Sequence, residues 1–160
     1  MTIPDWAVPI LEQWDVLPEN DFCVFLEDSG WEMITPISWK KVYGKGNLVI
    51  KFDYCGGYNR SHTTAEYFQW VRAKQKKRRY MVRPILHYRG LLIQPRLPEV
   101  CVPLYCDCEN AKMVARRLRI LDWYNHGYDS GGRLKFFDTD SSGSGWWNYY
   151  SSKNRKKRNM

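Results

Sequence analysis

The first 39 residues contain no lysine and no arginine, although the whole chain of 160 residues has 25 of them. Eight Asp and Glu residues stand in that stretch, so it lacks the basic start of a secretory signal peptide. The chain also has no run of about 18 apolar residues, which argues against a membrane-spanning segment. We therefore expect a cytoplasmic protein with no membrane partner.

The five cysteines are an odd number and have no paired spacing: Cys23, Cys55, Cys101, Cys106 and Cys108. This pattern favours reduced thiols in an intracellular protein. The last three could instead bind zinc together with a ligand from elsewhere, although their spacing does not match a CxxC knuckle.

Composition predicts one folded domain, because 44% of the residues are hydrophobic and 16% are aromatic. We expect that domain over residues 1–140, with a helical segment at 1–30. A Ser/Gly joint, an aromatic segment and a basic tail then occupy residues 141–160. Helices, about three strands, a helix, two strands, an amphipathic helix over 109–124 and a hairpin follow one another. This order predicts an α+β fold whose mostly antiparallel sheet carries one crossing helix.

Positive charge is concentrated in two runs, an expected loop at residues 72–79 and the tail at 153–158. Such runs often contact polyanions, so nucleic acid or an acidic protein surface is a candidate partner. In the tail, the contacts would come from Lys153, Arg155, Lys156, Lys157 and Arg158, with stacking on Trp146, Trp147, Tyr149 and Tyr150. The aromatic segment could equally pack back on the domain.

An aspartate ends the last expected strand, in the stretch GGRLKFFDTDSSGSG at residues 131–145. A turn at 130–132 and a strand at 133–137 lead to Asp138. A carboxylate at this place suits a metal ion, but aspartate is also common in turns. Both interpretations of Asp138 stay open from this pattern alone.

Four segments in order resemble the small lobe of protein kinases followed by a shortened catalytic segment: GWEMITPISWKKVYGKGNLVIKF, AEYFQWVRA, VRPILHYRGLLIQPRLP and DWYNHGYDSGGRLKFFDTD. In its overall sequence character the chain is similar to the host-directed serine/threonine kinase domains of phage early proteins. A phage origin would place it in the host cytoplasm, with a host protein as its partner.

The resemblance implies a role for each matching residue. Lys51 in LVIK would grip the nucleotide phosphates, and Glu66 would be its helical partner. The backbone around Gln94, Arg96 and Leu97 would meet adenine. Asn125 would serve the catalytic loop and, with Asp138, hold Mg²⁺ beside ATP.

Two of these residues have plainer interpretations. Lys51 could be an ordinary edge-strand lysine, and Glu66 could be the capping-box partner of Thr63.

The chain also departs from the kinase pattern. The stretch TPISWKK has no glycine where kinases have a glycine-rich loop. Ile120 stands at the position of the catalytic base, and the nearby acid is Asp122, three residues before Asn125. Only 22 residues follow Asp138, too few for a large helical lobe.

These departures favour a degenerate, pseudokinase-like protein that binds and modulates a host protein, with residual ATP and Mg²⁺ binding. One alternative is an active ATP-dependent serine/threonine kinase that uses Asp122 and Asn125. A second alternative is a basic nucleic-acid-binding protein.

Overall fold

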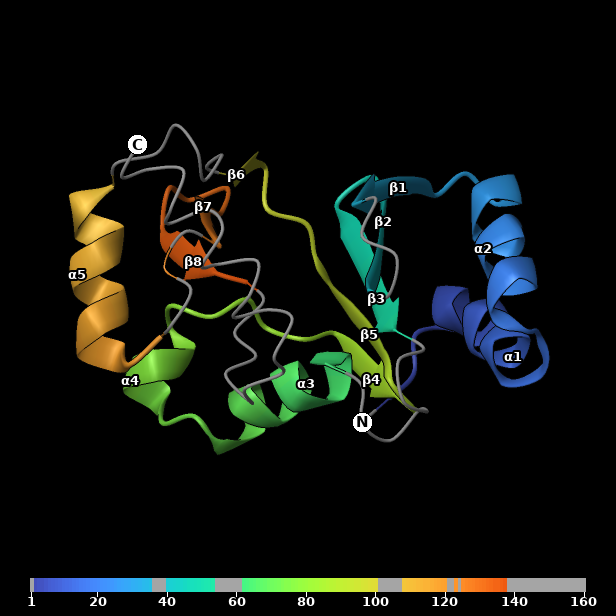
Figure 1. Ribbon diagram of the computed structural model, residues 1–160, viewed down its shortest axis with the longest axis horizontal. Helices are drawn as coiled ribbons and strands as arrows, with labels where there is room; N and C mark the ends of the chain where they lie inside the picture. The colour runs from blue at the N-terminus through green and yellow to red at the C-terminus, as the bar shows by residue number, and fades with distance from the viewer. Residues whose placement is uncertain are drawn as a thin grey trace, which may run out of the picture. The chain divides into compact units, whose positions relative to one another are not determined.

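The computed structural model describes residues 2–35, 40–53, 62–100, 108–120, 123 and 125–137 (Figure 1). Contacts within the chain divide it into two compact units. Unit 1 comprises Met1–Thr64 and Pro84–Arg96, and unit 2 comprises Ala65–Arg83 and Leu97–Met160. We describe each unit by itself.

Unit 1 contains a five-stranded antiparallel sheet with the strand order β1-β2-β3-β5-β4. Its strands are β1 (Glu32–Thr35), β2 (Lys40–Lys45), β3 (Leu48–Asp53), β4 (Leu86–Tyr88) and β5 (Leu91–Pro95). The β4–β5 turn has positive φ at both Arg89 (45°) and Gly90 (87°). Tight hairpin turns adopt this conformation because it matches the twist of the two strands.

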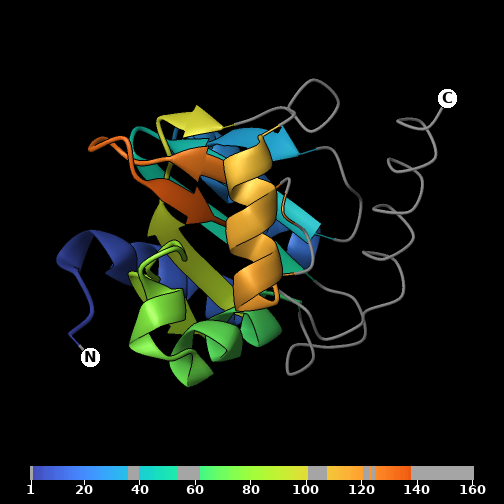
Figure 2. The same cartoon turned by 90° about the vertical axis from the view of Figure 1, so that its left-hand side faces the viewer.

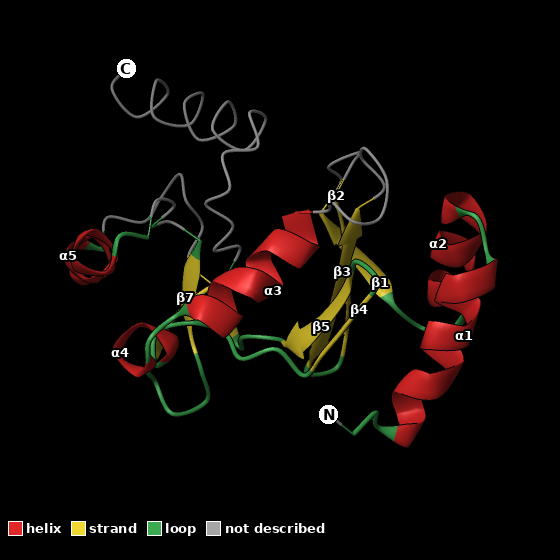
Figure 3. Ribbon diagram, turned by 90° about the horizontal axis from the view of Figure 1, so that it is seen from below, coloured by secondary structure: helices red, strands yellow, loops and turns green. Residues whose placement is uncertain are grey.

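Helices cover one face of this sheet. They are η1 (Asp5–Ala7), α1 (Val8–Val16) and α2 (Glu19–Asp28), and Figure 3 shows α1 and α2 on the same side of the strands. Their apolar residues form one core with alternate strand residues, including Phe22, Leu26, Tyr43, Ile50 and Phe52. Aromatic rings join the two layers: the centroids of Phe22 and Phe52 are 5.2 Å apart. Burial of this aromatic set holds the helices to the sheet.

Unit 2 is built around a three-stranded antiparallel sheet with the order β6-β7-β8. Its elements are most of α3 (His62–Arg72), then α4 (Gln75–Arg78), β6 (Glu99–Val100), α5 (Glu109–Leu118), β7 (His126–Tyr128) and β8 (Leu134–Phe136). Figure 2 shows α5 alongside β7 and β8. A core of Ala111, Val114, Ala115, Ile120, Leu134 and Phe136 joins the helix to the strands.

The α+β class and the antiparallel sheet confirm the coarse fold expected from the sequence. The helix α3 lies between the third and fourth strands, as predicted, and the short helix α4 follows it before β4. That residues 1–140 form a single domain stays a prediction, and residues 141–160 lie outside the described ranges.

Two expected boundaries are wrong. The helix predicted over 109–124 ends at Leu118, because Arg119 turns into the left-handed region (φ 58°) and the Ile120 amide donates back to the Ala115 carbonyl. The charged run 72–79, taken as a loop, contains the short helix α4.

Candidate functional site

Three buried polar side chains mark the face of the unit 1 sheet opposite the helix-packed core. Lys51, Asp53 and Gln94 are 4%, 2% and 3% exposed. Lys51 and Asp53 are two residues apart on β3, and the β3–β5 register pairs Val49 with Gln94 and Lys51 with Leu92. Because strand side chains alternate between faces, all three belong to one face, which we call the polar face.

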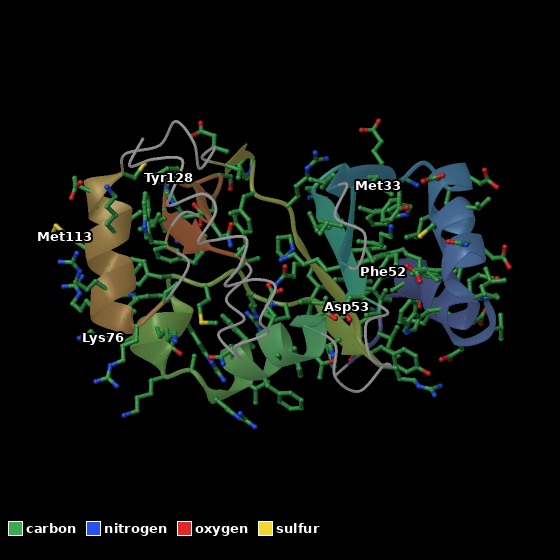
Figure 4. All side chains as sticks on the ribbon, in the orientation of Figure 1. Met33, Phe52, Asp53, Lys76, Met113 and Tyr128 are labelled. Atoms are coloured by element: carbon green, nitrogen blue, oxygen red, sulfur yellow. The ribbon has the colours of Figure 1, made fainter. Side chains whose placement is uncertain are left out.

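The neighbouring residues on β3 show this alternation. Ile50 and Phe52 are in the core with α1 and α2, whereas Lys51 and Asp53 leave the strand on the other side. Figure 4 labels Phe52 and Asp53 at this end of β3. The regular alternation of the strand therefore places Lys51 and Asp53 on the polar face, away from the apolar core.

Lys51 lies on the central strand of the sheet, since β3 pairs with β2 on one side and β5 on the other. The plainer interpretation of Lys51 as an edge-strand lysine is therefore wrong. A lysine that is almost completely buried loses hydration, and such a charge is retained where other polar groups compensate it.

Asp53 was missed by the sequence analysis. Its signal was present, because a carboxylate two residues after a strand lysine shares that lysine's face. The structure adds the burial of both groups, which the sequence pattern did not reveal.

Glu66 is also buried, at 3% exposure, on α3. Thr63 lies inside α3, which begins at His62, and its hydroxyl donates to the Gly90 carbonyl at 2.6 Å. Thr63 is thus not the residue that precedes the helix, and the capping box expected with Glu66 is wrong in its register. Lys51 belongs to unit 1 and Glu66 to unit 2.

The expected adenine-contacting stretch runs across the division between the units, with Gln94 and Arg96 in unit 1 and Leu97 in unit 2. Gln94 is buried in β5, whereas Arg96 is exposed and its backbone amide donates to the Asn47 carbonyl at 2.7 Å. Leu97 is half-buried. The backbone that the resemblance assigns to adenine therefore directly follows a central strand.

Asn125 lies at the start of the β7–β8 hairpin and is 9% exposed. Its carbonyl accepts a hydrogen bond from the Phe137 amide at 2.9 Å. Among the described residues its side-chain Nδ2 finds no hydrogen-bond partner. The structure therefore brings Asn125 beside the residue that precedes Asp138.

Asp122 and Asp138 lie outside the described residues, as do Lys153, Arg155, Lys156, Lys157 and Arg158. Within the described ranges, no group of three His, Cys, Asp or Glu residues could hold a metal ion. Of the two residues expected to hold Mg²⁺, the structure therefore describes Asn125 but not Asp138. The atom without a partner is the Nδ2 donor, which suits a hydrogen-bond acceptor, whereas Mg²⁺ would need the amide oxygen of Asn125.

The hairpin that carries Asn125 is held by specific contacts. The His126 ring is fully buried and its Nδ1 lies 2.7 Å from the Trp123 carbonyl. At the turn, the Gly131 and Arg133 amides donate to Asp129 Oδ1 at 2.9 and 3.0 Å. These bonds, the Arg133 one foremost, lower the pKa of Asp129. The predicted turn at residues 130–132 is confirmed, with Gly132 at φ 75°.

A cavity of about 410 Å³ lies on the helix-covered side of unit 1, away from the polar face. Its walls are mainly aromatic and aliphatic, from Trp6, Pro9, Ile10, Phe25, Trp31 and Leu48, with Ser29 and Lys45. Lys45 Nζ donates to the Ser29 carbonyl at 2.6 Å, so this ammonium is engaged at the rim. The cavity does not include any residue that the sequence assigned to a site.

Cys108 precedes α5 and is disulfide-bonded, which contradicts the expectation of reduced thiols at this position. Its partner is not among the described residues, where Cys23 is a free thiol. In the ranges that the structure describes, no helix has both the length and the apolar character needed to cross a bilayer.

Comparison with known proteins does not extend this description. No family model matches the chain, and no curated protein matches its sequence. Inference about function therefore rests on the residues and geometry above.

Proposed function

We propose that this chain is a minimal kinase-like protein that binds ATP with Mg²⁺ and modulates a partner protein by binding it. The observation that carries the proposal is Lys51, a lysine with 4% exposure on the central strand and on the polar face. Burying a lysine there is costly unless polar groups around it compensate its charge. A site that places a lysine among such groups on a sheet face suits the binding of a polyphosphate.

The arrangement around Lys51 supports the same proposal. An antiparallel sheet with the helix α3 between its third and fourth strands is what the resemblance to the kinase small lobe implies. Buried Glu66 lies on that helix, and the division between the units falls between Arg96 and Leu97, in the stretch taken as the link between lobes.

The chemistry assigns a distinct part to each residue. The Lys51 ammonium would neutralise phosphate oxygens, and the backbone after Gln94 would accept and donate hydrogen bonds at the adenine edge. Mg²⁺ prefers oxygen ligands, so the Asn125 amide oxygen and the Asp138 carboxylate would hold it. When bound, that ion neutralises the charge of the triphosphate.

A binding role is favoured over phosphoryl transfer by Ile120. This residue stands at the expected position of the catalytic base, and it is packed into the unit 2 core at 9% exposure. An apolar core residue cannot accept the proton of an attacking hydroxyl. The modulated protein would be a host protein if the chain comes from a phage.

Thermal unfolding with and without excess ATP and Mg²⁺ tests the nucleotide site. A ligand at about a hundred times its Kd stabilises the folded state by about 2.7 kcal/mol, so the midpoint should rise by at least about 5 °C. Lys51→Met should remove most of this rise, because it keeps the side-chain length without the charge.

Lys41→Met is the matched control. Lys41 pairs with Phe52 across β2 and β3, so it belongs to the opposite face of the sheet. The control should keep the full ATP shift. No shift in the wild type, or equal shifts in wild type and Lys51→Met, would overturn the proposed nucleotide site.

The alternative of an active kinase has its own test. An active enzyme would transfer labelled γ-phosphate to itself or to a general protein substrate, and Asp122→Asn would abolish the transfer. We expect no transfer above background from the wild type. Transfer that depends on Asp122 would replace the binding role with catalysis.

A further inference from the structure

Unit 2 carries a large excess of positive charge on its own. Its described residues include thirteen Lys and Arg but only four Asp and Glu, whereas those of unit 1 include six and nine. Like charges that are not compensated destabilise a compact unit by repelling one another. Their concentration in one unit therefore calls for a ligand of opposite charge.

The acidic residues of unit 2 do little to compensate this charge. Glu66 is buried, Glu109 pairs with Lys112 at 3.2 Å, and Asp129 pairs with Arg133 at 3.1 Å. Glu99 is the remaining described acid, on β6. Most of the basic side chains thus form no ion pair with a carboxylate in the described part of the unit.

Six exposed basic side chains on or next to α4 and α5 form no ion pair with any described residue: Lys74, Lys76, Arg79, Arg116, Arg117 and Arg119. They come from α4 with its flanking residues and from the end of α5. Both helices lie on the same side of unit 2 (Figure 1, Figure 2), and blue nitrogen atoms crowd their outer edge around Lys76 and Met113 (Figure 4). We call these six residues the basic surface.

Packing beneath the helices holds this surface in place. Tyr80, directly after α4, packs against the core that contains Val114 and Ala115 of α5. Lys135 Nζ donates to the Arg79 carbonyl at 2.7 Å. These contacts hold α4 and α5, which carry the basic surface, against the same apolar core.

Two other basic residues of α4, Arg78 and Lys77, contact the protein itself and are not part of the basic surface. Arg78 donates to the Trp70 and Val71 carbonyls at 2.9 and 2.7 Å and lies over the Trp70 ring. Lys77 is half-buried, and that burial lowers its pKa. This division shows that α4 is anchored by one side and presents the other to solvent.

We infer that the basic surface binds the phosphate backbone of nucleic acid without reading its bases. Four of the six residues are arginines, whose planar guanidinium pairs with phosphate through two hydrogen bonds. A membrane surface fits less well, because Ala111, Val114 and Ala115 of α5 are buried, which leaves Met113 as the exposed apolar side chain of this helix, too little to insert. This site is separate from the proposed nucleotide site.

Fluorescence anisotropy tests the inference with the full chain and a labelled oligonucleotide of about 20 nucleotides, as single strand and as duplex. The quadruple variant Lys74→Gln, Lys76→Gln, Arg116→Gln, Arg117→Gln should weaken binding on the order of 100-fold near physiological salt. The slope of log affinity against log salt should become shallower by about 3, since each lost phosphate contact retains a counterion.

The matched control removes four charges from unit 1 through Lys41→Gln, Lys45→Gln, Arg89→Gln and Arg96→Gln. It changes the net charge equally and should weaken binding several-fold at most. Lys51→Met should bind the oligonucleotide like the wild type, so failure of the nucleotide site leaves this inference intact. Circular dichroism confirms that each variant is folded.

Four outcomes would overturn the inference: no binding of either oligonucleotide by the wild type, equal losses in the two quadruple variants, loss only when residues 151–160 are deleted, and tighter binding to phosphatidylserine-containing vesicles. The third would assign the contact to the tail. The fourth would identify a membrane surface as the partner.

Discussion

Gly127 is required by the close approach of two backbone segments. It pairs with Val100 across β6 and β7, and a Cβ at this position would overlap the backbone oxygen of Glu99. Backbone cannot move aside like a flexible side chain, so Gly127→Ala should destabilise the protein by about 2–3 kcal/mol. Denaturant unfolding measures this loss.

Gly131→Ala is the control in the same hairpin. Its added methyl would meet the end of the Arg133 side chain at 3.3 Å, which can shift. We expect a change within about 0.5 kcal/mol. Equal losses at the two glycines would show that β6 does not constrain Gly127.

His87 gives unit 1 a dependence on pH. Burial lowers its pKa below the ordinary 6.5, and its Nε2 lies 3.2 Å from Thr64 Oγ1. The unfolded chain therefore takes up a proton at higher pH than the folded chain. The stability that neutral His87 contributes is complete above pH 6.5 and is lost as the pH falls through the lowered pKa.

Denaturant unfolding of wild type and His87→Gln between about pH 8 and pH 5 measures this contribution. The wild type should lose more stability than the variant as the pH falls below 6.5. Other groups titrate equally in both proteins and cancel in the comparison. Parallel curves for the two proteins would contradict the assignment to His87.

At the scale of secondary-structure elements, Arg78 ties α4 to the end of α3. Its guanidinium donates to the Trp70 and Val71 carbonyls in the last turn of α3, where the Trp70 carbonyl also accepts from the Ala73 amide at 3.2 Å. Arg78→Ala should therefore speed hydrogen exchange of the amides at 75–81 by about tenfold, the effect of about 1–2 kcal/mol in lost hydrogen bonds.

Arg79→Ala removes the same charge from the next residue. The Arg79 side chain is exposed, and it is the backbone carbonyl of Arg79 that accepts from Lys135. Exchange in this variant should stay close to that of the wild type. A similar increase in both variants would trace the effect to net charge and not to the α3 carbonyls.

Elements were predictable where local signals agreed. Gly46, at φ 57°, and Gly90 mark the β2–β3 and β4–β5 turns, and short apolar runs mark the strands β3 and β5 beside them. The end of α5 was not predictable. Apolar spacing continues through Leu121, and the left-handed turn falls on Arg119, a residue type that gives no such signal.

At the scale of the whole molecule, the α+β class followed from the order of periodic segments. The candidate site could be predicted from the sequence only in part. Motif order singled out Lys51, but the polar face needed the register of β3 and β5, which brings Gln94 opposite Val49. Pairing between strands about 40 residues apart along the chain is set by packing, and no local pattern encodes it.

The unequal charge of the two units has a consequence for the protein in solution. A net charge of +8 suggests molecules that repel one another, yet unit 1 has more acidic than basic residues among those described. Unlike patches on different molecules attract over a Debye length, about 30 Å at 0.01 M salt and 8 Å at 0.15 M. We therefore expect the protein to cluster and to turn turbid in buffers of low salt concentration, and to disperse when salt is added.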